Sequence, residues 1–478
     1  MIFAAVPRLA APVLIPLNPE AMISTRQPAP RPLLLVAAAV MIAAGSYAWA
    51  AFQPRPASTA LTGGTGGAGR AGIEVFGGDV AGQAGLDGRL SLDDQIAFWQ
   101  ARVRRSPRDF LSMVQLGLAE AEKARLTIDL ALYDQASAHV DAALAIDPHY
   151  GTALRARAQL RATLHDFDAA IVAATAAIDR DPRDDAARAI LGDALLGLGR
   201  LDDADAAYAA ISARSRGPAV DTRLAHLELV RGHLERAVAL AGQAYAAAAA
   251  EPDADLAYYG YQLGEIARLA GDAALARTGY GAALSVRPSD AGSMIGLALL
   301  DAADRRTDVA IAGLRRAAKI ARQPETLALL GDLLASSGDA AGAAAQYAAA
   351  RAMDVPGSLA AAVYDRSLVA FELDHGGTSE AMLERARASA AARPDAAGHD
   401  LVAWALFRLG RSREALAESR LALATGTRDA TILAHAGLIE QAAGDLAGGS
   451  ADLRAALALG PALDPFLRAE ATAAIAGS

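Results

Sequence analysis

Residues 403–466 read AWALFRLGRSREALAESRLALATGTRDATILAHAGLIEQAAGDLAGGSADLRAALALGPALDPF. Within this stretch Ala415 returns as another small residue, Gly449, after 34 residues. Ala422 returns as Ala456 after the same step of 34. Similarity of a chain to itself at a fixed period of this size is typical of proteins built from stacked copies of one small helical or mixed unit.

The same period extends through most of the chain. Small residues at equivalent places are separated by steps of 34, 34, 33, 39, 34, 33, 38, 34 and 34 residues. A second small residue often follows seven positions later, and prolines such as Pro148 and Pro288 end many units because proline breaks a helix. Each unit is therefore predicted to be two closely packed helices. The anchoring residues are Ala136, Ala170, Ala204, Ala237, Ala276, Ala310, Ala343, Ala381, Ala415 and Gly449.

Two further features recur in phase with these anchors. Leu-Gly pairs fall twelve residues before three of them, and tyrosines such as Tyr208, Tyr280 and Tyr347 fall four residues after them. This pattern resembles the tetratricopeptide repeat. The resemblance implies an all-α fold, a right-handed superhelical α-solenoid of about ten helix-turn-helix repeats over residues 108–461. Residues 403–466 are also similar to the end of bacterial repeat proteins that have an exported N-terminus.

The array is expected to have a helix at each end. Residues 91–107 are predicted to form an initial helix, with Ile96 and Trp99 on one face. Residues 462–478 are predicted to form a capping helix over the last repeat, because the final unit of a solenoid needs its apolar face covered.

The N-terminal part of the chain has a different composition. A tail over residues 1–32 precedes an apolar run at 33–52, which is about the ~20 residues that cross a bilayer as a helix. The run is either a transmembrane anchor or an export signal. A signal cleaved near Ala50 suits the small residues there, and translation could start at Met1 or at Met22.

Residues 53–90 are rich in Gly, Thr, Ala and Pro and have no hydrophobic period, so they are expected to form a flexible linker. The chain is accordingly expected in the cell envelope. It would be anchored in the cytoplasmic membrane with its repeats outside, or secreted or periplasmic after cleavage.

Composition excludes several kinds of chemistry. The 478 residues contain no cysteine, which removes thiolate metal sites, disulfides and cysteine nucleophiles. A formal net charge of −9 without a basic tract argues against nucleic acid as a partner. The eight histidines lack the spacing of a helical zinc site, and His435 is expected to bond between repeats. No phosphate-binding loop or nucleophile elbow occurs, so no catalytic, cofactor or metal residue is predicted.

What remains is a binding surface. In tetratricopeptide repeats the first helix of each unit lines a concave groove, and the resemblance therefore implies candidate residues for binding a protein or peptide. The tyrosines among them offer the large contact area common at binding hot spots, although they could equally pack between repeats. The candidates are Arg155, Gln159, Asp193, Tyr258, Tyr261, Glu265, Arg268, Glu325 and Asp332.

The sequence thus favours a non-enzymatic adaptor that acts in the bacterial cell envelope and binds protein partners through its groove. One alternative is an accessory factor for the assembly or export of an envelope polysaccharide, with aromatic side chains against the sugars. The other alternative is an enzyme whose site is built from arginines and carboxylates of different repeats.

Overall fold

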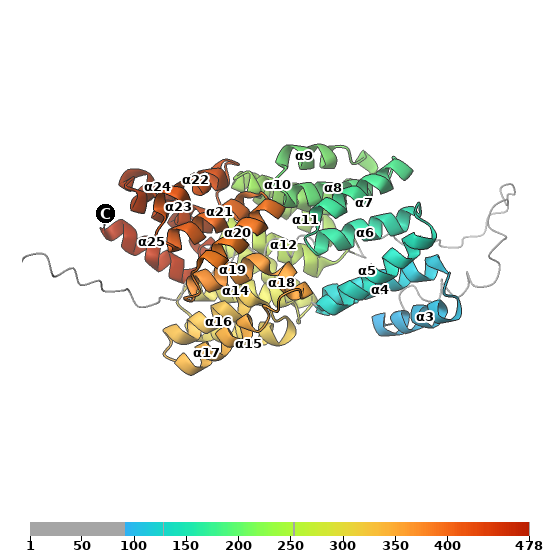
Figure 1. Cartoon of the computed structure of the whole chain (residues 1–478), viewed down its shortest axis with the longest axis horizontal. Helices are drawn as coiled ribbons and strands as arrows, with labels where there is room; N and C mark the ends of the chain where they lie inside the picture. Colours follow the sequence, from blue (N-terminus) through green and yellow to red (C-terminus); the bar gives the residue numbers. More distant parts are fainter. Residues whose placement is uncertain (1–90, 128, 252–253, 478) are drawn as a thin grey trace, which may run out of the picture. The chain divides into compact units, whose positions relative to one another are not determined.

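The computed structural model describes residues 91–127, 129–251 and 254–477, which contain 23 α-helices and no strand (Figure 1). The predicted all-α fold is confirmed. The predictions for residues 1–32, 33–52 and 53–90 lie outside the described residues.

Ten consecutive helical hairpins make up the body of the described chain, and most helices pack against the next one along the sequence. The first helices of the hairpins are α4 (Phe110–Thr127), α6 (Gly151–Thr163), α8 (Asp185–Gly197), α10 (Pro218–Val230), α12 (Leu256–Leu269), α14 (Ala291–Ala303), α16 (Pro324–Ser336), α18 (Leu359–Val363) with α19 (Asp365–Asp374), α21 (Ala396–Arg408) and α23 (Ala430–Ala443). The second helices are α5 (Leu130–Ile146), α7 (Phe167–Arg180), α9 (Leu201–Ala209), α11 (Leu234–Ala249), α13 (Ala273–Val286), α15 (Thr307–Ile320), α17 (Ala340–Arg351), α20 (Glu380–Ala392), α22 (Ser412–Leu423) and α24 (Leu446–Ala458).

Two helices flank the hairpins. The first is α3 (Leu92–Arg105), which buries Ile96 and Trp99 and packs against α4. The second is α25 (Pro465–Gly477), which buries Leu467 and Ala471 and packs against α23 and α24. The 3₁₀ turns Ala213–Ser215 and Gly460–Ala462 complete the described elements.

Aspartates begin most of these helices. Asp184, for example, precedes α8 and accepts a hydrogen bond of 2.9 Å from the Ala187 N–H. Such a side chain satisfies an amide that has no partner inside the helix, and its negative charge favours the positive end of the helix dipole. Asp202 and Asp203 lie in the first turn of α9 without capping it, and they pair instead with Arg231 and Arg200.

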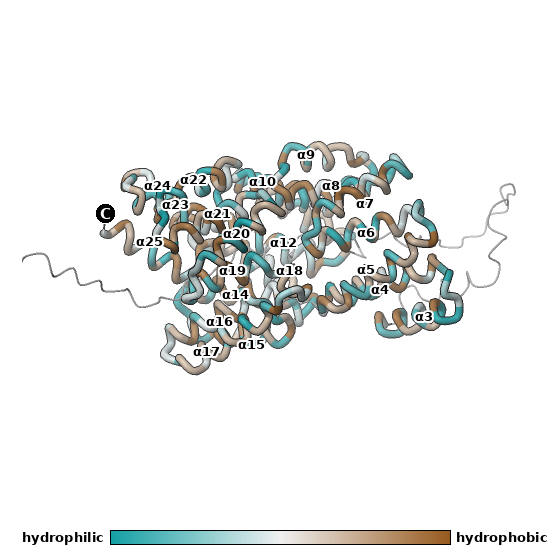
Figure 2. Tube along the Cα trace, viewed as in Figure 1, coloured by the Kyte–Doolittle hydropathy of each residue, from teal (hydrophilic) through white to brown (hydrophobic). Residues whose placement is uncertain are grey.

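Each helix turns one apolar stripe inward. On α15 the side chains of Ile311, Leu314 and Ala317 are buried, whereas Arg315 and Arg316 between them are exposed. Figure 2 shows the same alternation of hydrophilic and hydrophobic stretches along other helices. The stripes of successive hairpins cover one another, so the core is a row of clusters shared between neighbours, as expected for stacked repeats.

The eighth hairpin departs from the period. Its first helix is interrupted at Tyr364, between α18 and α19. In its second helix the predicted anchor Ala381 is exposed, and the packing positions are taken by Met382 and Ser389. The predicted anchor of this unit is therefore wrong by one residue. The anchor is the position that packs against the first helix, and in this unit that position is not an alanine.

Candidate functional site

All nine candidate residues lie on first helices, namely α6, α8, α12 and α16, as the repeat pattern predicts. Their exposure differs from the prediction, however. Six of the nine side chains are buried, and these are Gln159, Tyr258, Tyr261, Glu265, Arg268 and Asp332. Arg155, Asp193 and Glu325 are half-buried. A buried side chain cannot touch a partner in this conformation, so the prediction that these six residues contact a partner is not met in this structure.

Three repeats contain the same buried arrangement of a glycine, a carboxylate and a tyrosine. The ring of Tyr280 on α13 lies against Gly264 on α12, where a Cβ atom would come within 2.5 Å of the ring. Its hydroxyl donates a hydrogen bond to Glu265, the residue after that glycine. The glycine provides room for the ring, and the carboxylate satisfies the hydroxyl that burial would otherwise leave unpaired.

The third and seventh repeats have the same arrangement. Tyr208 packs on Gly192 and donates to Asp193 at 2.9 Å. Tyr347 donates to Asp332 at 2.5 Å and packs on the preceding glycine. In all three repeats the tyrosine follows the carboxylate by 15 residues. This spacing is visible in the sequence and would have predicted the pairs.

A basic side chain completes each arrangement. Arg223 on α10 binds both oxygens of Asp193, with Nε 2.9 Å and 3.1 Å from them. Arg268 on α12 places Nη2 3.0 Å from Glu265. At Asp332 the place of the arginine is taken by His375, with Nε2 at 3.0 Å.

The histidine arrangement shifts two pKa values. Burial alone would lower the pKa of His375, but its hydrogen bond and charge attraction to Asp332 raise the pKa. Burial raises the pKa of Asp332, against the opposing effect of His375. Arg223 and His375 come from the repeat that follows their carboxylate, so these contacts join neighbouring repeats.

A fourth buried polar cluster joins the last three repeats. The rings of Trp404 and His435 stack with centroids 3.9 Å apart. The indole N–H donates to Asp374 at 2.8 Å, and the imidazole Nδ1 lies 3.0 Å from Asp400. The predicted bond of His435 between repeats is confirmed. Burial raises the pKa of Asp374 to about 6.

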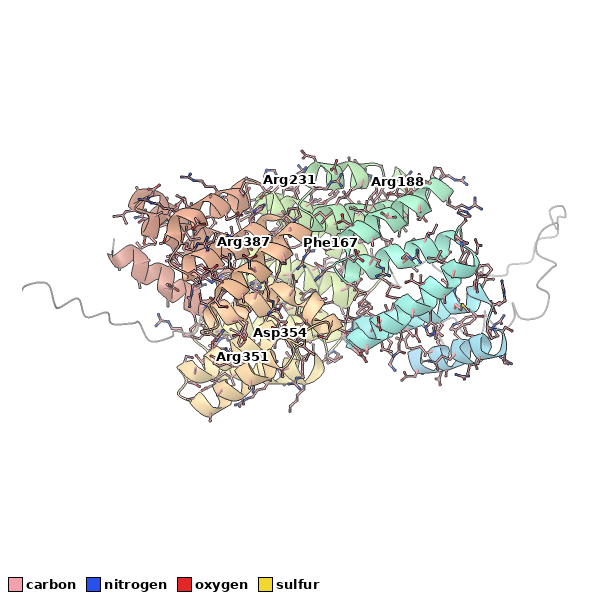
Figure 3. The ribbon with its side chains drawn as sticks, in the orientation of Figure 1. Phe167, Arg188, Arg231, Arg351, Asp354 and Arg387 are labelled. Atoms are coloured by element: carbon pink, nitrogen blue, oxygen red, sulfur yellow. The ribbon has the colours of Figure 1, made fainter. Side chains whose placement is uncertain are left out.

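Surface arginines also bridge neighbouring repeats. Arg231 lies 3.0 Å from Asp205, and Arg351 lies 2.9 Å from Glu372. Figure 3 labels Arg231 and Arg351 at the edges of the repeats. Exposed pairs of this kind contribute about 0–1 kcal/mol each, so they align the repeats more than they stabilise them.

Repeats far apart in the sequence also touch. Helix α18 contacts α5, and the apolar cluster of Val363, Tyr364 and Leu368 packs against Leu130 and Leu164 (Figure 1). Later repeats therefore cover part of the second repeat and of the end of the first.

Polar contacts accompany this closure. His165, in the turn between α6 and α7, places Nδ1 3.2 Å from the guanidinium of Arg393. Arg125 on α4 lies 3.8 Å from Asp255, which precedes α12. Both pairs join residues that are separated by more than one hundred positions.

The contact between His165 and Arg393 predicts a dependence of stability on pH. Burial, and then the positive charge of Arg393, lower the pKa of His165 to about 4 from 6.5, although Asp365 opposes them. Below pH 6.5 the unfolded chain takes up a proton that the folded chain resists, so stability falls as the pH falls toward 4. Between pH 6.5 and pH 5 the loss should be about 2 kcal/mol.

The matched variant is His165→Asn, because the backbone φ of 62° at this position suits asparagine and the amide does not titrate. The unfolding free energies of wild type and variant are measured in urea from pH 7.5 to pH 4.5. The stability advantage of the wild type over the variant should shrink or reverse as the pH falls. A difference that stays constant with pH would contradict the lowered pKa of His165.

The described residues contain neither a metal-binding cluster nor a membrane-spanning helix. No group of three or more His, Asp or Glu side chains there is arranged to hold a metal ion. Within the same residues no helix has both the length and the apolar character to cross a membrane.

Stacked helical hairpins with small residues at their crossing points define a helical-repeat protein of the solenoid class. The family model of the tetratricopeptide repeat matches residues 161–227, from α6 into α10. The matched segment is thus a tetratricopeptide repeat, a kind of repeat that typically forms non-catalytic scaffolds that bind other proteins.

Several solved structures share this kind of repeat. Human IFIT1, in a dimer with m7Gppp-AAAA, is 14% identical over 70% of this chain and 76% of its own, with a TM-score of 0.45. The APC/C hetero-tetramer Cut9–Hcn1 is 14% identical over 83% of this chain and 94% of the matched chain, with a TM-score of 0.30. Pseudomonas aeruginosa PilF is 20% identical over 53% of this chain and 96% of its own, with a TM-score of 0.28. No curated protein matches the chain in sequence. No function of this chain follows from likenesses this low.

Proposed function

We propose that this chain is a non-enzymatic adaptor of the bacterial cell envelope that binds protein partners on the outer face of its repeats. The observation that carries the proposal is the tetratricopeptide array itself, whose rigid hairpins present a surface that needs little ordering on binding. Tyrosines and basic side chains hold the carboxylates of Asp193, Glu265 and Asp332, which suits a structural role better than acid–base catalysis.

The outer face of α15 is the best candidate for the docking surface. Four cations lie exposed on this helix or just after it, and no hydrogen bond or ion pair engages them within the described residues. The chain as a whole is acidic, with a formal charge of −9, so this concentration of positive charge stands out. It suits an acidic segment of a protein partner. We name it the α15 basic face, and it consists of Arg315, Arg316, Lys319 and Arg322.

The envelope location rests on the apolar run at residues 33–52, which lies outside the described residues. A chain anchored or exported through that run would present its repeats outside the cytoplasmic membrane. The proposed partner is therefore a protein of the envelope.

The polysaccharide alternative has weaker support. It depends on aromatic side chains that could stack on sugars, and the tyrosine cluster of α12 was the strongest such feature in the sequence. Tyr258, Tyr259 and Tyr261 are all buried, so they offer no platform in this conformation.

The test is crosslinking in cells that express the full chain with a C-terminal tag, followed by capture and mass spectrometry. We expect a reproducible protein partner with crosslinks at α15. The triple charge reversal Arg315→Glu, Arg316→Glu and Lys319→Glu should lower its recovery about tenfold, because repulsion of an acidic segment replaces attraction. The same spectra report the N-terminal peptides, which should either start near residue 51 or come from the membrane fraction.

The matched control reverses three exposed cations of other second helices, by Arg413→Glu, Arg420→Glu and Arg454→Glu. It changes the net charge by the same amount and should leave recovery unchanged. Equal recovery with both triple variants would argue against the α15 basic face. A full-length chain found only in the soluble cell interior would argue against the envelope.

A further inference from the structure

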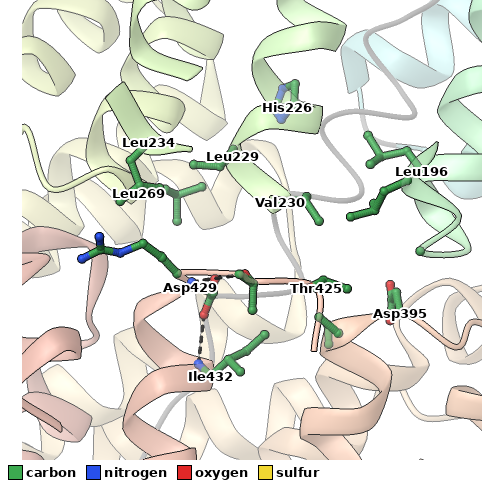
Figure 4. Close-up of a pocket in the computed structure, with 16 residues that line it drawn as sticks. Leu196, His226, Leu229, Val230, Leu234, Leu269, Asp395, Thr425, Asp429 and Ile432 are labelled. Carbon is green, nitrogen blue, oxygen red and sulfur yellow. Dashed lines mark hydrogen bonds between the residues drawn. The ribbon is translucent and has the colours of Figure 1, made fainter. Parts of the chain in front are cut away.

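A cavity lies where the third to fifth repeats meet the ninth and tenth (Figure 4). Its volume is about 130 Å³. One wall comes from the ends of α8, α10 and α12, and the facing wall comes from the segments that lead into α21 and α23. Figure 4 shows Leu229 and Val230 on the first wall and Thr425 with Asp429 on the second. The cavity is thus built by repeats that are far apart in the sequence.

Most of the lining is apolar. Leu196, Leu229, Val230, Leu234, Leu269 and Ile432 supply the larger side chains. On the facing wall Ala396 and Ala397 are small and leave the space open. An apolar protein cavity of about 150 Å³ is large enough to bind benzene, so this one has room for roughly six to eight carbon atoms.

The space does not come from loose contact between the repeats around it. A Cβ atom on Gly232 would overlap the carbonyl oxygen of Gly426, and one on Gly199 would lie 3.0 Å from the Cα of Asp395. Both glycines have positive φ, 78° and 72°, so side chains are disfavoured there on two counts. The two walls therefore already touch through their backbones beside the cavity, and they cannot move closer to close it.

Most polar groups of the lining already have partners. Asp395 pairs with Arg366 at 2.7 Å, and one oxygen of Asp429 caps α23 at 2.9 Å and 3.0 Å. His226 lies 2.6 Å from the side-chain oxygen of Gln262. The exception is Thr425, whose hydroxyl oxygen is buried and has no hydrogen-bond partner among the described residues.

An unpaired buried hydroxyl costs free energy that a ligand atom could recover. The lining offers little charge for a charged ligand, because Asp395 is paired with Arg366 and Arg428 is exposed to solvent. Asp429 is already held by two amides of α23, and burial raises its pKa, which favours the neutral carboxyl. A charged group would therefore lose its water without compensation.

We propose that this cavity binds a small neutral compound of about six to eight carbon atoms, with one hydroxyl or carbonyl oxygen that pairs with the hydroxyl of Thr425. The hydrocarbon part lies among Leu196, Leu229 and Leu234. Such a ligand contacts both walls and stabilises their association, because it binds only when the two sets of repeats are together.

The probes are 1-hexanol, hexanoate, hexylammonium and benzene, measured by calorimetry and thermal unfolding on the full chain. We expect 1-hexanol to bind and raise the Tm, and the two charged analogues to bind at least tenfold more weakly. Stronger binding of either charged analogue would overturn the neutral ligand class, and no binding of 1-hexanol would overturn the site.

Two kinds of variant locate the binding. Thr425→Val keeps the shape and removes the hydroxyl, so it should weaken 1-hexanol about tenfold and leave benzene within about twofold. Val230→Phe fills the cavity and should abolish both. Should Val230→Phe fail to fold, Ala396→Leu fills the space from the facing wall. A folded filling variant that binds 1-hexanol like the wild type would overturn the proposal, as would Thr425→Val with unchanged affinity for 1-hexanol.

Discussion

Replacing Gly279 with alanine is expected to lower the free energy of unfolding by about 3 kcal/mol or more, whereas the same change at Gly281, two residues further along α13, should raise it by roughly 0.5–1 kcal/mol. The reason lies in the crossing of α12 and α13. A Cβ atom on Gly279 would overlap the backbone nitrogen of Gly264 and lie 2.7 Å from the carbonyl oxygen of Gly260. Three glycines thus meet where the two backbones are closest.

Neither backbone can yield at little cost. A clash with a side chain is relieved by a new rotamer, but one between two helices requires the helices to separate. Separation would also disturb Tyr280, whose ring fills the space between Gly264 and Gly296. Gly281 is exposed and would meet nothing within 4 Å, so alanine there only gains helix propensity.

The two variants differ only in the position of one methyl group, so each is the control for the other. Because repeat arrays can unfold in parts, urea unfolding should be combined with hydrogen exchange of peptides from α12 and α13. Gly279→Ala should speed exchange there first. Equal stability of the two variants would contradict the predicted close approach.

The regular repeats show which features of the fold can be predicted from the sequence. The period and the helix-stopping residues predict ten hairpins, and anchors such as Ala276 and Ala310 are fully buried. These features follow from contacts within a repeat and between neighbours, which are short-range in sequence. The eighth repeat fails at Ala381 because an irregular first helix shifts the register there, and composition cannot reveal that shift.

The candidate groove could not be predicted in the same way. Each first helix is placed in its hairpin by local rules, but the exposure of its side chains also depends on the other repeats packed against it. The contact of α18 with α5 and that of Arg393 with His165 arise only after many small rotations between repeats have accumulated. The pairs of carboxylate and tyrosine could have been predicted from the sequence, because the two residues are always 15 positions apart. These pairs explain why Glu265 and Asp332 are buried.

The buried pair of Arg268 and Glu265 leads to the second large effect. Arg268→Met is expected to lower the free energy of unfolding by about 3–5 kcal/mol, because it leaves the carboxylate of Glu265 buried beside Tyr280 without a positive charge. Arg268 is itself only 1% exposed, so solvent does not screen the loss. The same substitution at Arg277, whose pairs with Asp301 and Asp304 are half-exposed, should cost about 0–1 kcal/mol.

The double variant Arg268→Met with Glu265→Gln separates the ion pair from the packing of the arginine stem. A neutral amide still accepts the hydrogen bond of Tyr280 and no longer needs a cation, so the double variant should be more stable than Arg268→Met alone. A double-mutant cycle measured by urea unfolding at pH 7 gives the coupling, which should exceed about 1 kcal/mol. Strict additivity would mean that Arg268 acts through its apolar stem alone, and that the buried charge of Glu265 is stabilised by other groups of the repeat.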